Sequence, residues 1–242
     1  MNAKIGLQIH VPQHQDTIQT PLGSLPDHLR PPSHASTGCL YTLHVNLLNI
    51  SLEYGYSNGK IEIMMNEVLE AIRNRRSVVR FESTVVEDDK IEAILEAGRW
   101  APSWINKQPW SFIVIKDQKT KDKLGEAVPT TFVQGLKEAP FSIAVTVNSL
   151  EDPYHYVEDG AAAAQNMALA AHSLGLNSSW IGVHDLRNQR NSAESKVRQI
   201  LEVPKDARVI ALLPIGHVKG EAPKKDRKTL YQIVYQEKFG QH

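Results

Sequence analysis

The order of helix-like and strand-like segments that begins near Met64 most constrains how this chain can fold. Four segments have the apolar character of strands, and they are Trp110–Asp117, Phe141–Asn148, Asn177–Val183 and Val209–Val218. Helix-like segments lie between them without the strict strand–helix–strand alternation that a parallel sheet requires. The pattern therefore predicts an α+β domain with one core of roughly 180 residues.

Caps and glycines define the expected helices. Asn66 is placed to cap a first helix and Asp88 a second one. Their apolar positions are Val68, Leu69 and Ile72 in the first helix, and Ile91, Ile94 and Leu95 in the second. Further predicted helices are Ala161–Leu174 stopped by Gly175, Ser192–Leu201 ended before Pro204, and a closing helix or extended arm over Thr229–Tyr235.

Residues 1–63 differ in composition from residues 64–242. They hold only seven charged residues, five of the ten histidines and five prolines, and their periodicity is poor. Leu40–Tyr54 could form a short strand or amphipathic piece without an evident partner. We interpret residues 1–63 as a mostly irregular N-terminal extension and residues 64–242 as the folded domain. A start at Met64 or Met65 is the alternative, which an N-terminal sequence beginning at Met1 would exclude.

Composition narrows the function classes. The formal net charge is zero, so no general attraction to nucleic acid or anionic membranes is expected. Cys39 is the single cysteine, which excludes an internal disulfide and fits a reducing, cytoplasmic compartment. No apolar run reaches the length of about 18 residues that a membrane span needs. The N-terminus lacks the basic-then-apolar order of a signal peptide.

Two basic clusters lie at opposite ends of the domain. The first surrounds Ser77 and the second follows the most apolar strand; they comprise Arg73, Arg75, Arg76 and Arg80, and Lys224, Lys225, Arg227 and Lys228. Alone, each has a structural explanation, as a basic helix end or a solvated loop. Together they suggest convergence on a phosphate, for which the arginine fork is well suited. No glycine-rich phosphate loop of the dinucleotide or triphosphate type occurs.

The segment Ala101–Trp110, "APSWINKQPW", has an unusual composition for a loop. Trp104 and Trp110 supply flat apolar faces, and the neighbouring polar residues supply uncharged donors and acceptors. This mixture suits a planar heteroaromatic ring with polar edges. Trp110 is better explained as core at the start of a strand, whereas Trp104 is a candidate to stack on the ring.

Other chemistries have weaker support. Gly182 in "SSWIG" would permit a ligand to approach the backbone closely, although a turn glycine is equally ordinary. No serine-nucleophile elbow occurs. His10 and His14 flank a proline, so no metal site is expected. With no metal ligands and no catalytic side chain evident, an organic cofactor is the natural carrier of reactivity.

Six motifs, in order, resemble the FMN-dependent nitroreductase family: "RRSVVRF", "APSWINKQPW", "DGAAAAQNMALAAHSLGL", "SSWIG", "LLPIGHVKG" and "PKKDR". The resemblance runs from about Met64 to the C-terminus. It implies a central mixed, mostly antiparallel sheet flanked by helices, in an intertwined homodimer with two FMN sites at the interface. The alanine-rich Ala161–Leu174 is then expected in the core of that interface.

The resemblance also implies which residues bind FMN. Those implied to meet the phosphate and ribityl chain are Arg75, Arg76, Ser77, Lys225 and Arg227. Those implied to cover the flavin from the other subunit are Pro102, Ser103, Trp104, Asn106 and Gln108. Ile181 and Gly182 are implied to meet the ring near N5 with their backbone.

Two residues depart from the family pattern. Relatives often carry a basic residue two positions after the serine, where this chain has Val79 followed by Arg80. Either Arg80 substitutes through a local shift, or another residue supplies the charge near the flavin. Trp104 is bulkier than the small residue often found at its position, so it is expected to narrow the substrate cleft or to act as a stacking lid.

The resemblance implies an NAD(P)H oxidoreductase that reduces electron-poor small molecules, such as nitroaromatics or quinones, by ping-pong two-electron transfer. NADH and NADPH are not distinguished. Three alternatives stay open: a flavin-dependent reductive dehalogenase or flavin-fragmenting enzyme, a flavin-binding protein without turnover, and a reductase with a non-nicotinamide donor. A dehalogenase usually carries an extra lid, for which little room exists between Asn148 and His155.

Overall fold

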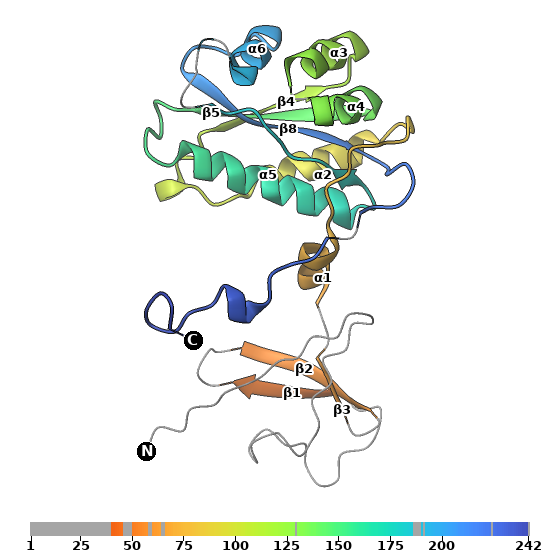
Figure 1. Ribbon diagram of the computed structural model, residues 1–242, viewed down its shortest axis with the longest axis vertical. Helices are drawn as coiled ribbons and strands as arrows, with labels where there is room; N and C mark the ends of the chain where they lie inside the picture. Colours follow the sequence, from red (N-terminus) through yellow and green to blue (C-terminus); the bar gives the residue numbers. More distant parts are fainter. Residues whose placement is uncertain are drawn as a thin grey trace. The chain divides into compact units, whose positions relative to one another are not determined.

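The computed structural model describes residues 66–128, 130–185, 190, 192–223 and 225–241, together with the backbone of three earlier strands. The chain divides into two compact units, Met1–Glu70 and Ala71–His242. In the first unit the strands are β1 (Leu40–Val45), β2 (Ile50–Ser57) and β3 (Lys60–Ile63), which pair antiparallel in that order. Figure 1 colours the chain along its sequence.

A five-stranded sheet forms the centre of the second unit. Its strands are β4 (Trp110–Ile115), β5 (Phe141–Asn148), β6 (Asn177–Ser178), β7 (Ile181–Gly182) and β8 (Ala207–Gly216). The order is β4-β5-β8-β6, with β7 also paired to β8, and every one of these pairings is antiparallel. The predicted α+β class is confirmed.

Helices cover both faces of this sheet (Figure 1). On one face lie α2 (Asp88–Arg99) and α5 (Tyr156–Ser173). On the other lie α3 (Gln118–Ala127), α4 (Thr130–Glu138) and α6 (Ala193–Ile200). Two covering layers are needed because β5 and β8 are buried almost along their whole lengths, so neither face of the sheet tolerates water.

Alternation along β5 divides the core into two clusters. Phe141, Ile143 and Val145 pack toward α2 and α5, whereas Ala144 packs toward the opposite layer. The register with β8 shifts between Val145 and Thr146, which marks a β-bulge. The central strands are therefore held by side chains on both faces.

The first helix, α1 (Glu67–Asn74), begins as predicted but does not contribute to the core. The Asn66 side chain caps it, because its Oδ1 accepts the Leu69 N–H at 2.9 Å. No residue of α1 is buried, and its apolar residues Val68, Leu69 and Ile72 are exposed. An amphipathic helix with an exposed apolar stripe has a surface that suits a further partner.

The prediction that Asp88 caps α2 was wrong. Glu87 is the N-cap residue, its side chain makes no capping hydrogen bond, and Asp88 is the first residue of the helix. The acidic group at a helix start still has a favourable interaction with the helix dipole. Ile91 and Ile94 are buried as expected, and Leu95 packs against the core from a half-buried position.

Other helices and strands differ from the predicted ones in their bounds or number. Helix α5 begins at Tyr156, five residues before the predicted start, and Gly175 follows it with φ +76°, a conformation that ends a helix at little cost for glycine. The predicted strand Asn177–Val183 is two short strands, β6 and β7, which pair in sequence along β8. Helices α3 and α4 were not predicted.

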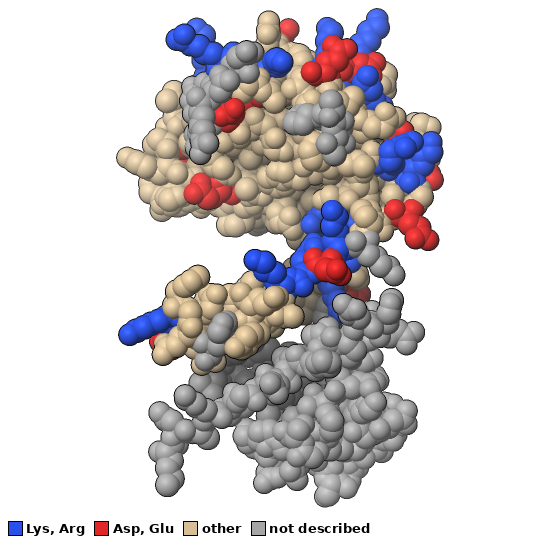
Figure 2. Space-filling view, in the orientation of Figure 1, with Lys and Arg blue, Asp and Glu red and all other residues tan. Residues whose placement is uncertain are grey.

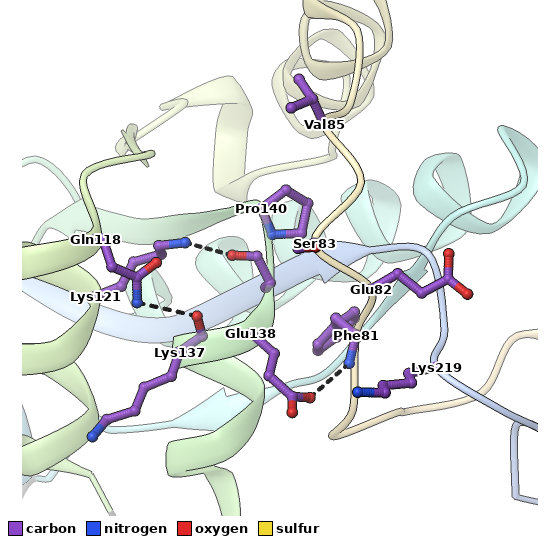
Figure 3. A pocket seen from close by; sticks show the side chains of 11 residues that line it. Phe81, Glu82, Ser83, Val85, Gln118, Lys121, Lys137, Glu138, Pro140 and Lys219 are labelled. Carbon is purple, nitrogen blue, oxygen red and sulfur yellow. Dashed lines mark hydrogen bonds between the residues drawn. The ribbon is translucent and has the colours of Figure 1, made fainter.

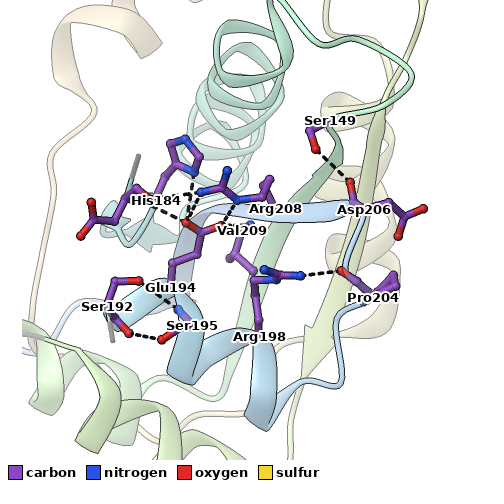
Figure 4. Close-up of polar contacts among 11 residues, drawn as sticks. Ser149, His184, Ser192, Glu194, Ser195, Arg198, Pro204, Asp206, Arg208 and Val209 are labelled. Carbon is purple, nitrogen blue, oxygen red and sulfur yellow. Dashed lines mark hydrogen bonds and ion pairs between the residues drawn. The ribbon is translucent and has the colours of Figure 1, made fainter. Parts of the chain in front are cut away.

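A buried ion pair joins α6 to β8 (Figure 4). Glu194 is 2% exposed and accepts hydrogen bonds from Arg208 Nε at 2.6 Å and Nη2 at 2.7 Å. It also accepts the backbone N–H groups of Asp185 at 3.0 Å and Val209 at 3.2 Å. Burial alone would raise the pKa of Glu194, but the hydrogen bonds from Arg208 and Asp185 hold that pKa below its ordinary value.

Gly160 allows α5 to approach the sheet closely. A Cβ at Gly160 would lie 2.7 Å from Ile210 Cγ1 and 2.9 Å from Val147 Cγ1. Gly160→Ala is therefore expected to destabilise the fold by about 1–3 kcal/mol through overpacking, relative to a helix glycine with room for a methyl group. Gly135 of α4 is the matched control, because the nearest atoms to its Cβ would lie at 3.4 and 3.5 Å, which is ordinary van der Waals contact. Urea unfolding of both variants measures the difference, and equal midpoints would contradict this packing argument.

Among the helices that the structure describes, none is long and apolar enough to cross a membrane.

Candidate functional site

The two basic clusters approach one another in the structure. Burial, then the neighbouring positive charge of Arg227, and then that of Arg76, lower the pKa of Arg75. Burial, followed by the charges of Arg75 and Arg76, also lowers the pKa of His172 near the end of α5. In Figure 2, Lys and Arg side chains gather around the carboxyl end of α1. Repelling cations held this closely suit an anionic ligand.

Arg75 and Arg76 use their guanidinium groups differently. Arg76 Nη1 donates to the backbone oxygens of Arg73 at 2.6 Å and Arg75 at 3.0 Å, so it helps to complete the end of α1. Arg75 Nη1 contacts Ser77 Oγ at 3.5 Å, whereas its buried Nε has no hydrogen-bond partner among the described residues. A buried donor without a partner is costly unless a ligand satisfies it.

The second cluster is less organised. Lys225 and Arg227 are exposed, and Arg227 Nη1 donates to its neighbour, the Asp226 backbone oxygen, at 3.1 Å. Lys224 lies outside the described residues. The charge of Arg227 acts on Arg75, so the structure brings these two members of the clusters near one another, and a phosphate between them stays a prediction.

Backbone bonds attach the first cluster to the edge of the sheet. Ser77 forms an isolated bridge with Ser178 at the end of β6, and Val78 N–H donates to the Ser178 oxygen at 3.1 Å. The "RRS" and "SSWIG" motifs are thereby brought together. Among the described residues, a Cβ added at Gly182 would meet only Trp180, at 3.5 Å, so none of them requires a glycine there.

The Ala101–Trp110 loop has a strained backbone. Three non-glycine residues lie in the left-handed region, with φ +39° at Ile105, +58° at Asn106 and +52° at Gln108. Such conformations cost on the order of 1–3 kcal/mol each and cluster at functional sites. They are unfavourable above all for a β-branched residue such as Ile105. The Ser103 hydroxyl supports the far end of the segment by accepting the Gln108 N–H at 2.9 Å.

Trp104, in the same loop, is 40% exposed. Its ring packs edge-on to Tyr154 at 6.1 Å and tilted against His155 at 5.4 Å between centroids. Its backbone N–H donates to both carboxylate oxygens of Asp159 on α5, at 3.1 and 3.3 Å. These contacts hold a large flat side chain half open to solvent, and none of them involves a residue of the basic clusters.

Arg80, the candidate substitute for a basic residue at the position of Val79, is paired with a carboxylate in the structure. Arg80 Nε donates to the two carboxylate oxygens of Glu138 at 3.1 and 3.0 Å, and Glu138 also accepts the Phe81 N–H at 3.1 Å. Of the two explanations considered for this departure, a local shift of Arg80 toward a ligand is therefore not supported.

A pocket of about 590 Å³ is lined in part by Glu138 (Figure 3). Its lining includes Phe81, Glu138, Pro140 and the buried Lys121, whose Nζ donates to the Ala139 oxygen at 2.6 Å. No predicted site residue lines it. The pocket is therefore separate from the converging arginines and from the Trp104 loop.

Three residues near the arginine clusters and the Trp104 loop were not predicted from the sequence. His172 faces the two arginines, and Asp152 and Asp159 lie beneath the Trp104 loop. The available signal was the group of acids in Glu151–Asp159, immediately before the alanine-rich part of α5. Within the described ranges, no group of three or more histidine, cysteine or acidic residues is arranged to hold a metal ion.

Comparison with known proteins places this geometry in a family. The model of the nitroreductase family matches residues 72–135 and 130–217. An NADH dehydrogenase/NAD(P)H nitroreductase of Archaeoglobus fulgidus is 38% identical over 160 residues, which are 65% of this chain and 88% of that protein.

Two solved structures are similar over most of their length. One, an NADH dehydrogenase/NAD(P)H nitroreductase of Parabacteroides distasonis, superimposes with a TM-score of 0.66 at 31% identity, over 72% of this chain and all of that one. The other, a Desulfovibrio desulfuricans nitroreductase in complex with FMN, gives a TM-score of 0.62 at 30% identity, over 73% of this chain and 99% of that one. The chain belongs to the nitroreductase family.

Proposed function

We propose that this chain is an FMN-dependent NAD(P)H oxidoreductase that reduces electron-poor small molecules, nitroaromatics or quinones, in sites shared between two copies. The family and the names of its relatives support the flavin and the nicotinamide donor. The observation that carries the proposal is the meeting of Arg75 with Arg227, where a buried guanidinium nitrogen has no partner among the described residues.

The residues present fit an FMN phosphate. A phosphate between Arg75 and Arg227 would accept the unpartnered Arg75 Nε–H and reduce the repulsion between the two cations. Ser77 lies within reach of the same arginine and would add a hydroxyl to the phosphate or ribityl chain. Arg76 completes the end of α1, so its proposed contribution is its charge, and Lys225 would add a further charge from the second cluster.

The ring end of FMN would lie along the edge formed by β6 and β7. Ser77 pairs with Ser178, which lies three residues before Ile181. The arginine cluster and the backbone of Ile181 and Gly182 are therefore attached to the same edge of the sheet. The open space beside Gly182 suits close approach of a planar ring. Pro102, Ser103, Trp104, Asn106 and Gln108 are proposed to cover a flavin from the second copy.

Exposed apolar residues support the homodimer. They occur in α1 and in the C-terminal segment, and comprise Val68, Leu69, Ile72, Leu230, Tyr231, Ile233, Val234 and Phe239. A second copy could bury large apolar side chains of this kind, which would remove them from water. Half-buried alanines on the outer side of α5 are proposed to lie in the same interface, as the sequence led us to expect.

Bound FMN would supply the two-electron chemistry, taking hydride from the nicotinamide and delivering it to the acceptor. The chain would contribute binding, orientation and exclusion of water, and no side chain is proposed to act as a nucleophile. Trp104 is proposed to stack on the nicotinamide or on the acceptor in turn. Because the nicotinamide and the acceptor would use the same stacking position in turn, we expect ping-pong kinetics.

A visible absorption spectrum of the purified protein tests this proposal, with NADH and then NADPH added under anaerobic conditions. The expected result is an oxidised flavin spectrum that bleaches with at least one donor and recovers when a quinone is added. A flavin that no nicotinamide reduces would exclude the donor assignment. A colourless protein that cannot be reconstituted with FMN would overturn the proposal as a whole.

A further inference from the structure

Two buried carboxyl groups lie beneath the Trp104 loop. Asp159, in the first turn of α5, is 5% exposed, and Asp152, in the preceding turn, is fully buried. The Oδ1 of Asp152 accepts the Tyr154 and His155 N–H groups at 3.0 and 2.9 Å. Its Oδ2 is buried, and no N–H or hydroxyl group of the described residues donates to it. This carboxylate oxygen therefore lacks a hydrogen-bond donor, which a protonated neighbouring carboxyl group would supply.

Asp159 is the neighbour that can supply this proton. Burial and the adjacent Asp152 carboxylate raise the pKa of Asp159, although the Trp104 N–H partly opposes this. The pKa of Asp152 is lowered: burial opposes the change, and the two backbone N–H groups and Asp159 outweigh it. Two adjacent buried carboxyls rarely ionise together, so one proton is shared between them.

We infer that Asp159 is a positioning residue, which shares a proton with Asp152 and thereby holds the Trp104 N–H and the strained covering loop in place over the flavin. One oxygen of the protonated carboxyl accepts the Trp104 N–H, while its O–H donates to Asp152 Oδ2. The inference rests on the proposed role of the Ala101–Trp110 loop. It explains how three left-handed residues persist in a segment that is half open to solvent.

The arrangement gives the loop a defined pH dependence. Because the pKa of Asp159 is raised, the shared proton is fully present at low pH and is lost as the pH rises through that raised pKa. Loss of the proton leaves two adjacent buried negative charges, which the loop can relieve by moving away and admitting water. The other ionisable group that acts on both carboxyls is His155, whose positive charge would favour their ionised forms.

The test uses holoenzyme labelled with 5-fluorotryptophan. The chain has four tryptophans, so four fluorine resonances are expected, and Trp104→Phe identifies the one that belongs to Trp104. Asp159→Ala should move this resonance toward the position of a solvent-exposed tryptophan and leave the other three in place. Asp159→Asn should keep it at the wild-type position, because an asparagine amide reproduces both hydrogen bonds of the protonated acid.

A pH titration completes the test. The wild-type Trp104 resonance should shift toward the Asp159→Ala position as the pH rises, and the Asp159→Asn resonance should not. A wild-type resonance that stays fixed until the protein unfolds would overturn the inference, as would an Asp159→Asn resonance that titrates in the same way. The comparison of wild type with Asp159→Asn tests the inference even if Asp159→Ala does not fold, because asparagine is isosteric with aspartic acid.

Flavin measurements on the same samples separate this inference from the proposed function. A displaced loop should raise the KM for the acceptor and change the emission of bound FMN, with little loss of FMN itself. If the Trp104 resonance moves while the flavin emission and this KM stay unchanged, Asp159 positions the loop but the loop does not cover a flavin. If the resonance does not move in Asp159→Ala, the inference fails whatever the flavin does.

Discussion

Replacing Glu194 with alanine is expected to lower the free energy of unfolding by about 3–5 kcal/mol. The substitution leaves Arg208, which is itself almost fully buried, without its ionic partner. It also removes the acceptor of the Asp185 and Val209 N–H groups, which tie the start of α6 to the central strand β8. Urea unfolding monitored by circular dichroism measures the loss.

Glu96→Ala is the matched control for this variant. Glu96 also accepts hydrogen bonds from an arginine, at 2.8 Å from Arg99 Nε, but both side chains are about half exposed. Solvent screens an exposed pair, so a far smaller change in unfolding midpoint is expected. Equal effects of the two substitutions would mean that burial of the Glu194 pair does not matter to stability.

The Glu194 ion pair also predicts a pH dependence. The pKa of Glu194 is lowered in the fold, so its stabilisation is present at neutral pH and is lost as the pH falls through the lowered value. Glu194→Gln should be less stable than wild type at neutral pH, and its stability should fall less steeply in acid. A Gln variant with the wild-type acid dependence would show that other carboxyl groups control acid unfolding.

The second large effect is expected on cofactor binding. Arg75→Ala should weaken FMN binding roughly ten- to a hundredfold, because a hydrogen bond to a charged group contributes on the order of 1.5–3 kcal/mol. Arg227→Ala should have an effect of the same order, since its charge acts at the same place. The dissociation constant is measured by titrating apoprotein with FMN and following the quenching of flavin fluorescence.

Arg80→Ala is the control for charge and for position in sequence. Arg80 lies five residues from Arg75 but pairs with Glu138, so its removal should leave FMN affinity unchanged. An Arg75→Ala protein that retains FMN through dialysis with wild-type affinity would refute the phosphate assignment. A loss of FMN in Arg80→Ala equal to that in Arg75→Ala would show that neither arginine acts specifically.

Strands whose own residues require burial were predicted well from the sequence. Phe141–Asn148 and the apolar run that begins at Val209 are strands because continuous β-branched and apolar residues require burial on both faces. The approach of Arg75 to Arg227 was also expected, from the two clusters read together. The two strands follow from local sequence alone, whereas the approach of Arg75 to Arg227 was inferred by combining two distant segments.

Features that depend on distant residues were not predictable in the same way. Helix α3 is rich in charged residues and has little apolar periodicity. Nevertheless, its residue Leu124 is fully buried in the core. The pairing of Arg80 with Glu138 joins positions 58 residues apart. The support of Trp104 by Asp159, across 55 residues, likewise depends on where α5 lies and cannot be read from local pattern.

The attachment of Ser77 to the sheet edge beside Ile181 and Gly182 has an evolutionary consequence. The arginine cluster at Ser77 and the backbone of Ile181 and Gly182, both proposed to bind the cofactor, are attached to β6, β7 and β8, whereas the segment proposed to meet the acceptor is a separate loop between α2 and β4. We therefore expect mutations in that loop to alter which compounds are accepted, with less loss of the prosthetic group than mutation of Arg75. Such a division lets one scaffold diversify its substrates through a few substitutions at residues 101–110.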